Sequence, residues 1–156
     1  GRSLTLLVNI ENTAKSAAAN EIARQLQEAG LRVTVERLPW EEYTAALAAR
    51  DFDLYLGEVY LTPDFDLSAL IAPGGALNYG GWEDSVISGL LSAFRTAEGE
   101  LRQSAAASLY RYLCQQAPIA PICFKNGSVL TQYGRLDQLN PTQYNVFYDL
   151  SHWTVP

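Results

Sequence analysis

The sequence predicts an α/β fold in which a mixed, mostly parallel sheet carries packed helices. Short apolar runs at residues 4–8, 32–38 and 52–56 are separated by two stretches that have the apolar spacing of helices. Strands that alternate with helices form parallel sheets through right-handed crossovers. The chain has 156 residues, 48% of them hydrophobic, and a domain of that size buries about two-thirds of its unfolded surface. We therefore expect the three runs to lie side by side in one sheet.

The first run, residues 4–8, leads through turn-forming residues into a long helical pattern that Gly30 ends. Apolar and polar residues then alternate from residue 31, as in a strand with one solvated face. Pro39 suits the start of a second helix, and the two glutamates that follow Trp40 favour its positive end. This helix runs to about residue 50 and leads directly into the third strand.

The middle of the chain contains two loops and two longer helices. A weak helical turn follows the loop at 57–66, and residues 73–82 are too rich in glycine for regular structure. Helical spacing resumes over 83–95 and again over 100–116, and Pro118 ends the second of these helices.

The carboxyl-terminal part of the chain is expected to close the sheet with a hairpin. Apolar runs at 119–124 and 128–132 flank Asn126 and Gly127, and an Asn-Gly pair between two such runs is a strong hairpin signal. The tail from residue 140 onward is aromatic but has little periodicity, which predicts irregular packing.

The composition excludes some classes of protein. The net charge is −6 and the 11 Lys and Arg residues are scattered, so a nucleic acid is not an expected partner. No apolar run approaches the length of about 20 residues that a membrane helix needs. The chain has no methionine and no signal-peptide pattern. We interpret residues 1–3 as a cloning scar and residues 4–156 as a single α/β piece excised from a longer protein.

Enzymatic motifs are missing from the sequence. His152 is the only histidine, and there is no GxSxG, HExxH or P-loop spacing. Cys114 and Cys123 have no CxxC or Cys/His spacing for zinc, so we expect no metal site and no cofactor. The two cysteines are interpreted either as small buried apolar residues or as a disulfide pair. We therefore expect a protein that is not an enzyme.

Several short pieces of the sequence carry a family resemblance through their order and spacing. They are residues 4–9 with Asn12, 30–33, Pro39-Trp40 with Tyr43, 51–54, Asn78-Tyr79 with Asp84 and Leu90-Leu91, Arg102, and 117–122. Together they resemble the second lobe of family 5 extracellular solute-binding proteins, the receptors of dipeptide, oligopeptide and nickel ABC importers. The resemblance spans nearly the whole chain.

The resemblance implies a periplasmic-binding-protein-like lobe, one of two α/β lobes that enclose a ligand. The implied partners are a peptide or another small solute, the partner lobe of the same parent chain, and an ABC permease reached through the parent. The implied location is extracellular or periplasmic, with the parent lipid-anchored to the cell membrane. An alternative is a sensory or protein-interaction domain that reuses the lobe, and neighbouring genes would separate the two functions.

The expected ligand-binding residues follow the third strand and occupy the glycine-rich loop. They are Gly57, Glu58, Val59, Tyr60, Asn78, Tyr79 and Trp82. Ligands of open α/β sheets bind outside the carboxyl ends of the strands, which here means Gly57 onward. We expect the segments 57–60 and 78–82 to come together and form one wall of a cleft.

Peptide-binding members of the resembled family carry, in the loop after this strand, an aspartate that meets the ligand's amino group. The matching position here falls near Val59, and Glu58 is the only close carboxylate. Asp64 and Asp66 are interpreted as loop or cap residues. Tyr60 offers either an aromatic face to a ligand or a lid on the core, and Trp82 either lines the cleft or covers the core.

Overall fold

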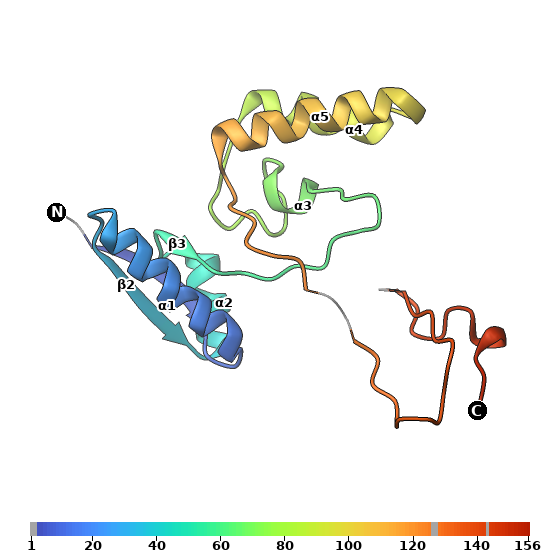
Figure 1. Ribbon diagram of the computed structural model, residues 1–156. Coiled ribbons are helices and arrows are strands. Elements are labelled where there is room, and N and C mark those ends of the chain that lie inside the picture. The colour runs from blue at the N-terminus through green and yellow to red at the C-terminus, as the bar shows by residue number, and fades with distance from the viewer. Residues whose placement is uncertain (1–2, 126–127, 143) are drawn as a thin grey trace. The chain divides into compact units, whose positions relative to one another are not determined.

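The computed structural model describes residues 3–125, 128–142 and 144–156. The chain divides into two compact units, residues 1–118 and residues 119–156. The first unit contains the strands and α-helices in the order β1-α1-β2-α2-β3-α3-α4-α5 (Figure 1). The described part of the second unit has a single short 3-10 helix, Leu150–His152.

The sheet of the first unit has three parallel strands in the order β2-β1-β3. The central strand β1 (Leu4–Asn9) pairs along its whole length with β2 (Val33–Leu38) and more briefly with β3 (Leu54–Tyr55). The predicted α/β fold and the side-by-side arrangement of the three strands are confirmed.

The third strand is shorter than the expected run of residues 52–56. It lies at the edge of the sheet, where only β1 offers backbone partners. Two further backbone bonds extend the pairing at both ends: Asp53 N–H donates to the Thr5 carbonyl at 3.1 Å, and Leu56 N–H donates to the Leu7 carbonyl at 2.9 Å. The chain therefore stays close to β1 up to the residue before Gly57.

Two crossover helices cover opposite faces of the sheet. Helix α1 (Thr13–Glu28) packs on Leu6 and Val8, and helix α2 (Trp40–Ala49) packs on Leu7. Because both faces are covered, the interior of β1 is apolar on both sides, as is typical of parallel sheets. The buried core residues on the α1 side are Leu6, Val8, Ala19, Ala23, Val33 and Leu56, and those on the α2 side are Leu7, Tyr43 and Leu47.

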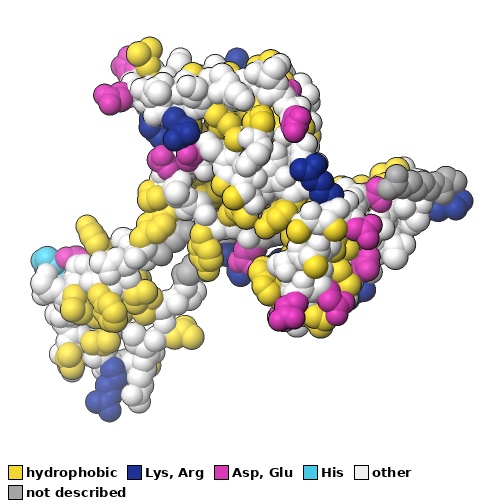
Figure 2. All heavy atoms as spheres, turned by 180° about the vertical axis from the view of Figure 1, so that it is seen from behind, with side chains coloured by type: hydrophobic (Ala, Val, Ile, Leu, Met, Phe, Trp, Pro, Cys, Tyr) yellow, Lys and Arg dark blue, Asp and Glu magenta, His cyan; other side chains and the backbone are white. Residues whose placement is uncertain are grey.

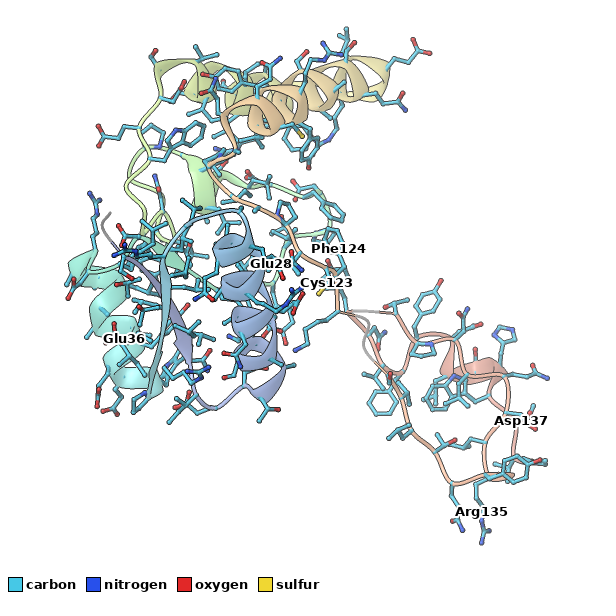
Figure 3. All side chains as sticks on the ribbon, turned by 60° about the vertical axis from the view of Figure 1, so that its left-hand side comes forward. Glu28, Glu36, Cys123, Phe124, Arg135 and Asp137 are labelled. Carbon is cyan, nitrogen blue, oxygen red and sulfur yellow. The ribbon has the colours of Figure 1, made fainter. Side chains whose placement is uncertain are left out.

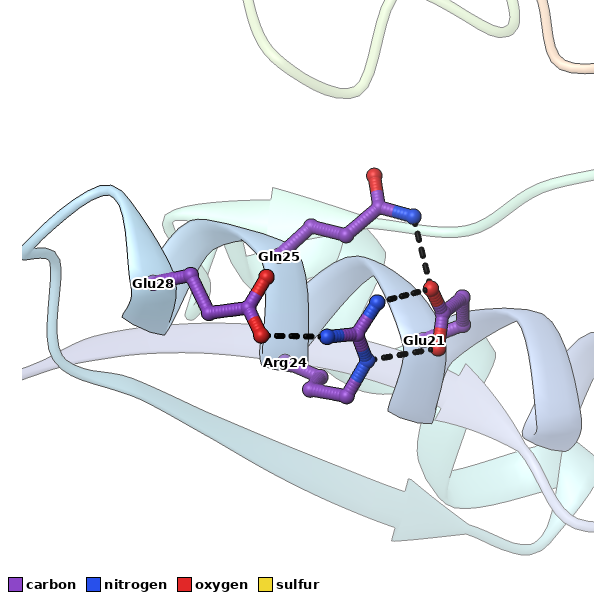
Figure 4. A network of polar contacts seen from close by, with 4 residues as sticks. All are labelled: Glu21, Arg24, Gln25 and Glu28. Carbon is purple, nitrogen blue, oxygen red and sulfur yellow. Dashed lines mark hydrogen bonds and ion pairs between the residues drawn. The ribbon is translucent and has the colours of Figure 1, made fainter.

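The outer face of α1 carries a chain of charged and polar contacts (Figure 4). Arg24 donates hydrogen bonds to Glu21 and to Glu28, and Gln25 donates to Glu21 at 2.7 Å. The hydrogen bonds from Arg24 are the main reason that the pKa of Glu21 falls to about 2. Pairs at these spacings support a solvated helix face, although exposed ion pairs contribute little to stability.

The rest of the first unit consists of α3 (Ser68–Ile71) and the packed pair α4 (Ser85–Thr96) and α5 (Gly99–Gln116). Asp84 caps α4 by accepting from two backbone N–H groups, and it also accepts from the Tyr112 hydroxyl of α5 at 2.6 Å. The buried side chains of the two long helices are Ile87, Leu91, Phe94, Leu109 and Leu113. No helix in the described ranges is long and apolar enough to cross a membrane.

The predicted hairpin is wrong in its strands. Residues 119–124 and 128–132 are not β-strands, and the Asn126-Gly127 turn lies outside the described residues. Residues 120–124 and 128–132 are exposed, and no strand lies beside either run in the described chain, so their backbone groups have no ladder to join. The antiparallel pairing found in the described part of this unit is one isolated bridge, between Asp137 and Thr154.

The interpretation of the cysteines as buried residues is also wrong. Cys114 on α5 and Cys123 in the second unit are both exposed, and both are free thiols. Figure 3 shows Cys123 and Phe124 on the extended segment that follows α5. Their burial was inferred from apolar neighbours in sequence, but Cys114 is on the solvated side of its helix and residues 120–125 are all exposed.

Candidate ligand-binding site

The strand order places the favoured position for a ligand between the carboxyl ends of β1 and β3. The chain leaves β1 toward β2 on one side and returns to β3 on the other, so the strand order reverses there. Open α/β sheets bind ligands at such a switch point. Two segments meet this edge: residues 9–12, which begin at the last residue of β1, and residues 57–60, which follow β3. Only the second segment was expected from the sequence to belong to a site.

The carboxylate of Glu58 is directed to the start of α1. Its Oε2 accepts from Asn12 Nδ2 at 3.5 Å and lies 4.0 Å from Lys15 Nζ. Asn12 is also the N-cap of α1, since its Oδ1 accepts the backbone N–H of Lys15 at 3.0 Å. Asn12 and Lys15 are therefore two residues of this edge that sequence reasoning missed. The available signal was their position just after an apolar strand.

A second carboxylate, Glu11, joins the carboxyl end of β1 to the start of α2. It accepts from Asn9 Nδ2 at 2.9 Å and from the backbone N–H of Trp40 at 2.7 Å. These two hydrogen bonds lower the pKa of Glu11, and the bond from Asn9 has the larger effect. Pro39, the N-cap of α2, offers no side-chain oxygen, so Glu11 supplies the cap from another segment.

Three tyrosines gather on the α2 side of the same edge. The Tyr55 ring lies close to Gly57, where an added Cβ would be 2.9 Å from it, and Tyr79 meets Tyr55 edge-on at 6.0 Å between ring centroids. The Tyr43 hydroxyl donates to the Leu56 carbonyl at 3.1 Å. Burial, reinforced by the neighbouring Tyr55 and Tyr79, raises the pKa of Tyr43 to about 12. The glycine-rich loop thus reaches the third strand through Tyr79.

The loop itself is held by Asn78. Its Nδ2 donates to the carbonyls of Ala72 at 3.0 Å and Trp82 at 2.8 Å, and its Oδ1 accepts from the Trp82 N–H at 2.9 Å. These bonds close the loop into one compact turn. The Asn78 amide is therefore engaged in shaping the loop, and Tyr79 is the residue that the turn presents to the sheet.

The remaining expected site residues differ in exposure. Val59 and Tyr60 are exposed, Tyr60 to 91%, and Trp82 is half-buried. Tyr60 therefore does not cover the core. The structure brings Tyr79 to Tyr55 beside Gly57, and it turns Glu58 toward α1. A role of the seven residues in ligand binding stays a prediction.

The two aspartates downstream are loop and cap residues, as interpreted. Asp66 accepts the backbone N–H of Ser68 at 2.9 Å, and Asp64 lies 3.5 Å from the guanidinium of Arg102. The hydrogen bonds from Ser68 are the main cause of the lowered pKa of Asp66. A group of three or more His, Cys, Asp and Glu side chains suited to a metal ion is not found among the described residues.

Comparison with known proteins shows which fold this chain shares. No protein-family model and no curated protein sequence matches the chain. Among solved structures, AppA from Clostridium difficile superposes with a TM-score of 0.82 at 16% identity, covering 99% of this chain and 33% of AppA. The murein tripeptide binding protein MppA of Escherichia coli gives a TM-score of 0.70 at 22% identity, covering 77% of this chain and 24% of MppA.

A third similar structure is NikA from Staphylococcus aureus in complex with Ni(L-His)2, with a TM-score of 0.65 at 15% identity over 74% of this chain and 26% of NikA. The expected resemblance to family 5 solute-binding proteins is thus confirmed at the level of the fold. The chain spans about a quarter to a third of the length of the structures it matches.

Proposed function

We propose that this chain is the ligand-binding second lobe of the solute-binding protein of an ABC importer, and that it takes a peptide or another small solute. The observation that carries the proposal is the edge between β1 and β3, where Tyr55 and Tyr79 form an aromatic wall beside Gly57. Similar structures include a murein tripeptide binding protein and a protein that holds a nickel-histidine complex, which supports small polar solutes as the ligand class.

The second part of the proposal is that a partner lobe completes both the cleft and the fold. In the described residues of the second unit, none of the large apolar side chains is fully buried. Figure 2 shows yellow side chains across the surface of this unit, which is recognisable by the single histidine in cyan. The exposed large apolar residues of the unit are Ile122, Phe124, Val129, Leu130, Tyr133, Tyr144, Val146, Phe147, Tyr148, Leu150 and Val155.

The second unit buries too little apolar surface by itself to offset the conformational entropy that it loses on folding. It therefore needs another surface to pack on. The comparison with AppA supports a surface within the same protein, because AppA matches both units of this chain yet is three times as long. The second unit would then pack on the part of the parent that this chain does not contain. Such a parent would lie outside the cytoplasm, anchored by a lipid, and deliver its ligand to a permease.

The proposal is tested by isothermal calorimetry on the full-length receptor and on the 156-residue chain. The titrants are trialanine, a mixture of tripeptides, and nickel with histidine. We expect micromolar or tighter binding of one titrant to the full-length protein and at least tenfold weaker binding to the chain alone. Ligand pockets bury about 70–90% of the ligand's surface, and a single lobe supplies only part of the contacts that bury it. Equal affinity in both proteins would refute the half-site, and no binding to the full-length protein would refute the ligand class.

A further inference from the structure

The tyrosine cluster at the edge of the sheet has unused hydrogen-bonding capacity. Tyr43, Tyr55 and Tyr79 come from α2, β3 and the glycine-rich loop. The Tyr43 hydroxyl is engaged with the Leu56 carbonyl. The hydroxyls of Tyr55 and Tyr79 have no hydrogen-bond partner within the described part of the chain, and both residues are half-buried. Burial also raises the pKa of Tyr55 above its ordinary value of 10.0.

Asn9 adds an acceptor without a donor on the same face of the sheet. It follows Leu7 by two residues on β1, so both side chains point to the α2 face, where Tyr55 is the partner of Leu7 in the register. Asn9 is only 5% exposed, and its Oδ1 has no hydrogen-bond donor among the described residues. The bond from its Nδ2 to Glu11 sets which way the amide points.

A buried amide oxygen without a donor is costly and rare in folded proteins. On this face of the sheet, the Asn9 amide oxygen therefore lacks one donor that the described residues do not supply. This observation is independent of the tyrosine rings, and it concerns the same edge of the sheet.

The carboxylates of this edge are already engaged by the chain. Glu58 faces Lys15 and Asn12, and Glu11 accepts from Asn9 and from the start of α2. Their charge is partly compensated by these donors, and that weakens them as receptors for an ammonium group. The groups that remain are neutral: two phenol hydroxyls, two aromatic edges and one amide oxygen.

We propose that the tyrosine cluster binds an uncharged secondary amide of the ligand. An amide has one N–H donor and one carbonyl acceptor. The N–H, directly or through a bound water, serves Asn9, and the carbonyl accepts from the hydroxyl of Tyr55 or Tyr79. This inference rests on the proposed function and adds the chemistry of the group that is recognised. A peptide backbone and the acetamido group of an amino sugar both supply such an amide.

The test uses the full-length receptor and probes that differ in charge and source. Calorimetry compares trialanine, N-acetyl-trialanine amide and N-acetylglucosamine as titrants. The variants are the double substitution Tyr55→Phe with Tyr79→Phe, which keeps both rings, and Glu58→Gln. Tyr110→Phe on α5 is the matched control. Circular dichroism checks that each variant is folded, and the single variant Tyr79→Phe replaces the double one if folding is lost.

We expect one of the amide probes to bind, and the acetylated peptide to bind within about threefold of the free peptide if the source is a peptide. Loss of the two hydroxyls should weaken binding about tenfold, since net hydrogen bonds are modest. Tyr110→Phe should change affinity less than twofold, and Glu58→Gln should weaken binding less than the loss of the two hydroxyls does. Binding of the sugar instead of the peptides would support the amide chemistry and assign its source.

The inference is overturned if acetylation of the peptide abolishes its binding. It is also overturned if Glu58→Gln abolishes peptide binding while the double substitution of Tyr55 and Tyr79 leaves the affinity unchanged. In either case the receptor still binds a peptide, so the proposed function stands. If only nickel with histidine binds, the inference of amide recognition is wrong, but the proposed receptor function still holds. If the full-length protein binds none of these probes, the proposed function itself fails.

Discussion

The guanidinium group of Arg50 fills the space that a side chain on Gly81 would need. A Cβ built on Gly81 would overlap Arg50 Nη1, and Gly81 has a φ of 64°. Arg50 follows α2 as its C-cap in the left-handed conformation, with a φ of 58°. The end of α2 and the glycine-rich loop are therefore in close contact at these two residues.

Substituting Gly81 should loosen this contact. Gly81→Ala places a Cβ in the left-handed region, which costs about 1–2 kcal/mol, and it also displaces Arg50. We expect a loss of at least that size in urea unfolding. Gly80→Ala is the matched control, because nothing lies within 4 Å of a Cβ there. Equal stability of the two variants would contradict a special requirement for glycine at position 81.

The centre of the sheet should be the most sensitive part of the core. Leu7 is fully buried between the sheet neighbours and α2, so Leu7→Ala should reduce the free energy of unfolding by about 2–5 kcal/mol. Leu101 is 73% exposed, and Leu101→Ala should stay within about 0.5 kcal/mol of the parent sequence. Chemical denaturation with both variants checks this. A small effect at Leu7 would mean that the sheet is not the stable centre of the unit.

The hydroxyl of Tyr43 should stabilise the carboxyl end of β3. Tyr43→Phe keeps the ring but leaves the Leu56 carbonyl without this donor, at an expected cost of about 1 kcal/mol. Thermal unfolding measures the change, with Tyr110→Phe as a control on a hydroxyl outside the cluster. The proposed contribution is absent if the two variants melt at the same temperature.

Acid should weaken the α4–α5 pair through Asp84. The hydrogen bond from Tyr112 is the main cause of the lowered pKa of the Asp84 carboxyl, whose ordinary value is 3.8. Because the folded-state pKa lies below the unfolded one, the stabilisation is fully present above about pH 4 and is lost as the pH falls through the folded-state value. Asp84→Asn should remove this part of the acid dependence. The measurement is the free energy of unfolding of the parent sequence and of Asp84→Asn from pH 5 to pH 2. Parallel curves for the two proteins would refute the role of Asp84.

The order of elements in the first unit was predictable because its signals are local. Apolar runs, helical spacing and the stop at Gly30 predicted α1 to within two residues, and the glutamates after Trp40 marked the start of α2. The hairpin prediction used equally good local signals and was wrong in its strands. A strand needs a partner strand, and the described chain places none beside residues 119–124 and 128–132.

The candidate site was only half predictable. The sequence indicated Gly57 and Tyr79, because parallel strands deliver their following loops to one edge and glycines permit close approach. It did not indicate that Glu58 would turn toward Lys15, or that Asn9 and Glu11 would hold the start of α2. Those contacts join residues from different segments, so no spacing along the chain encodes them.

By itself, then, the sequence determined the α/β class, the parallel sheet, the helices of the first unit and the strand end from which a site would extend. Periodicity and turn chemistry act over a few residues, so they can be recognised in the sequence without knowledge of the tertiary structure. Only the tertiary structure decided which acids are engaged by the chain, which hydroxyls are left over, and that Tyr79 meets Tyr55. Packing decides these points, because each depends on the direction in which a side chain leaves its own element and on what another element places there.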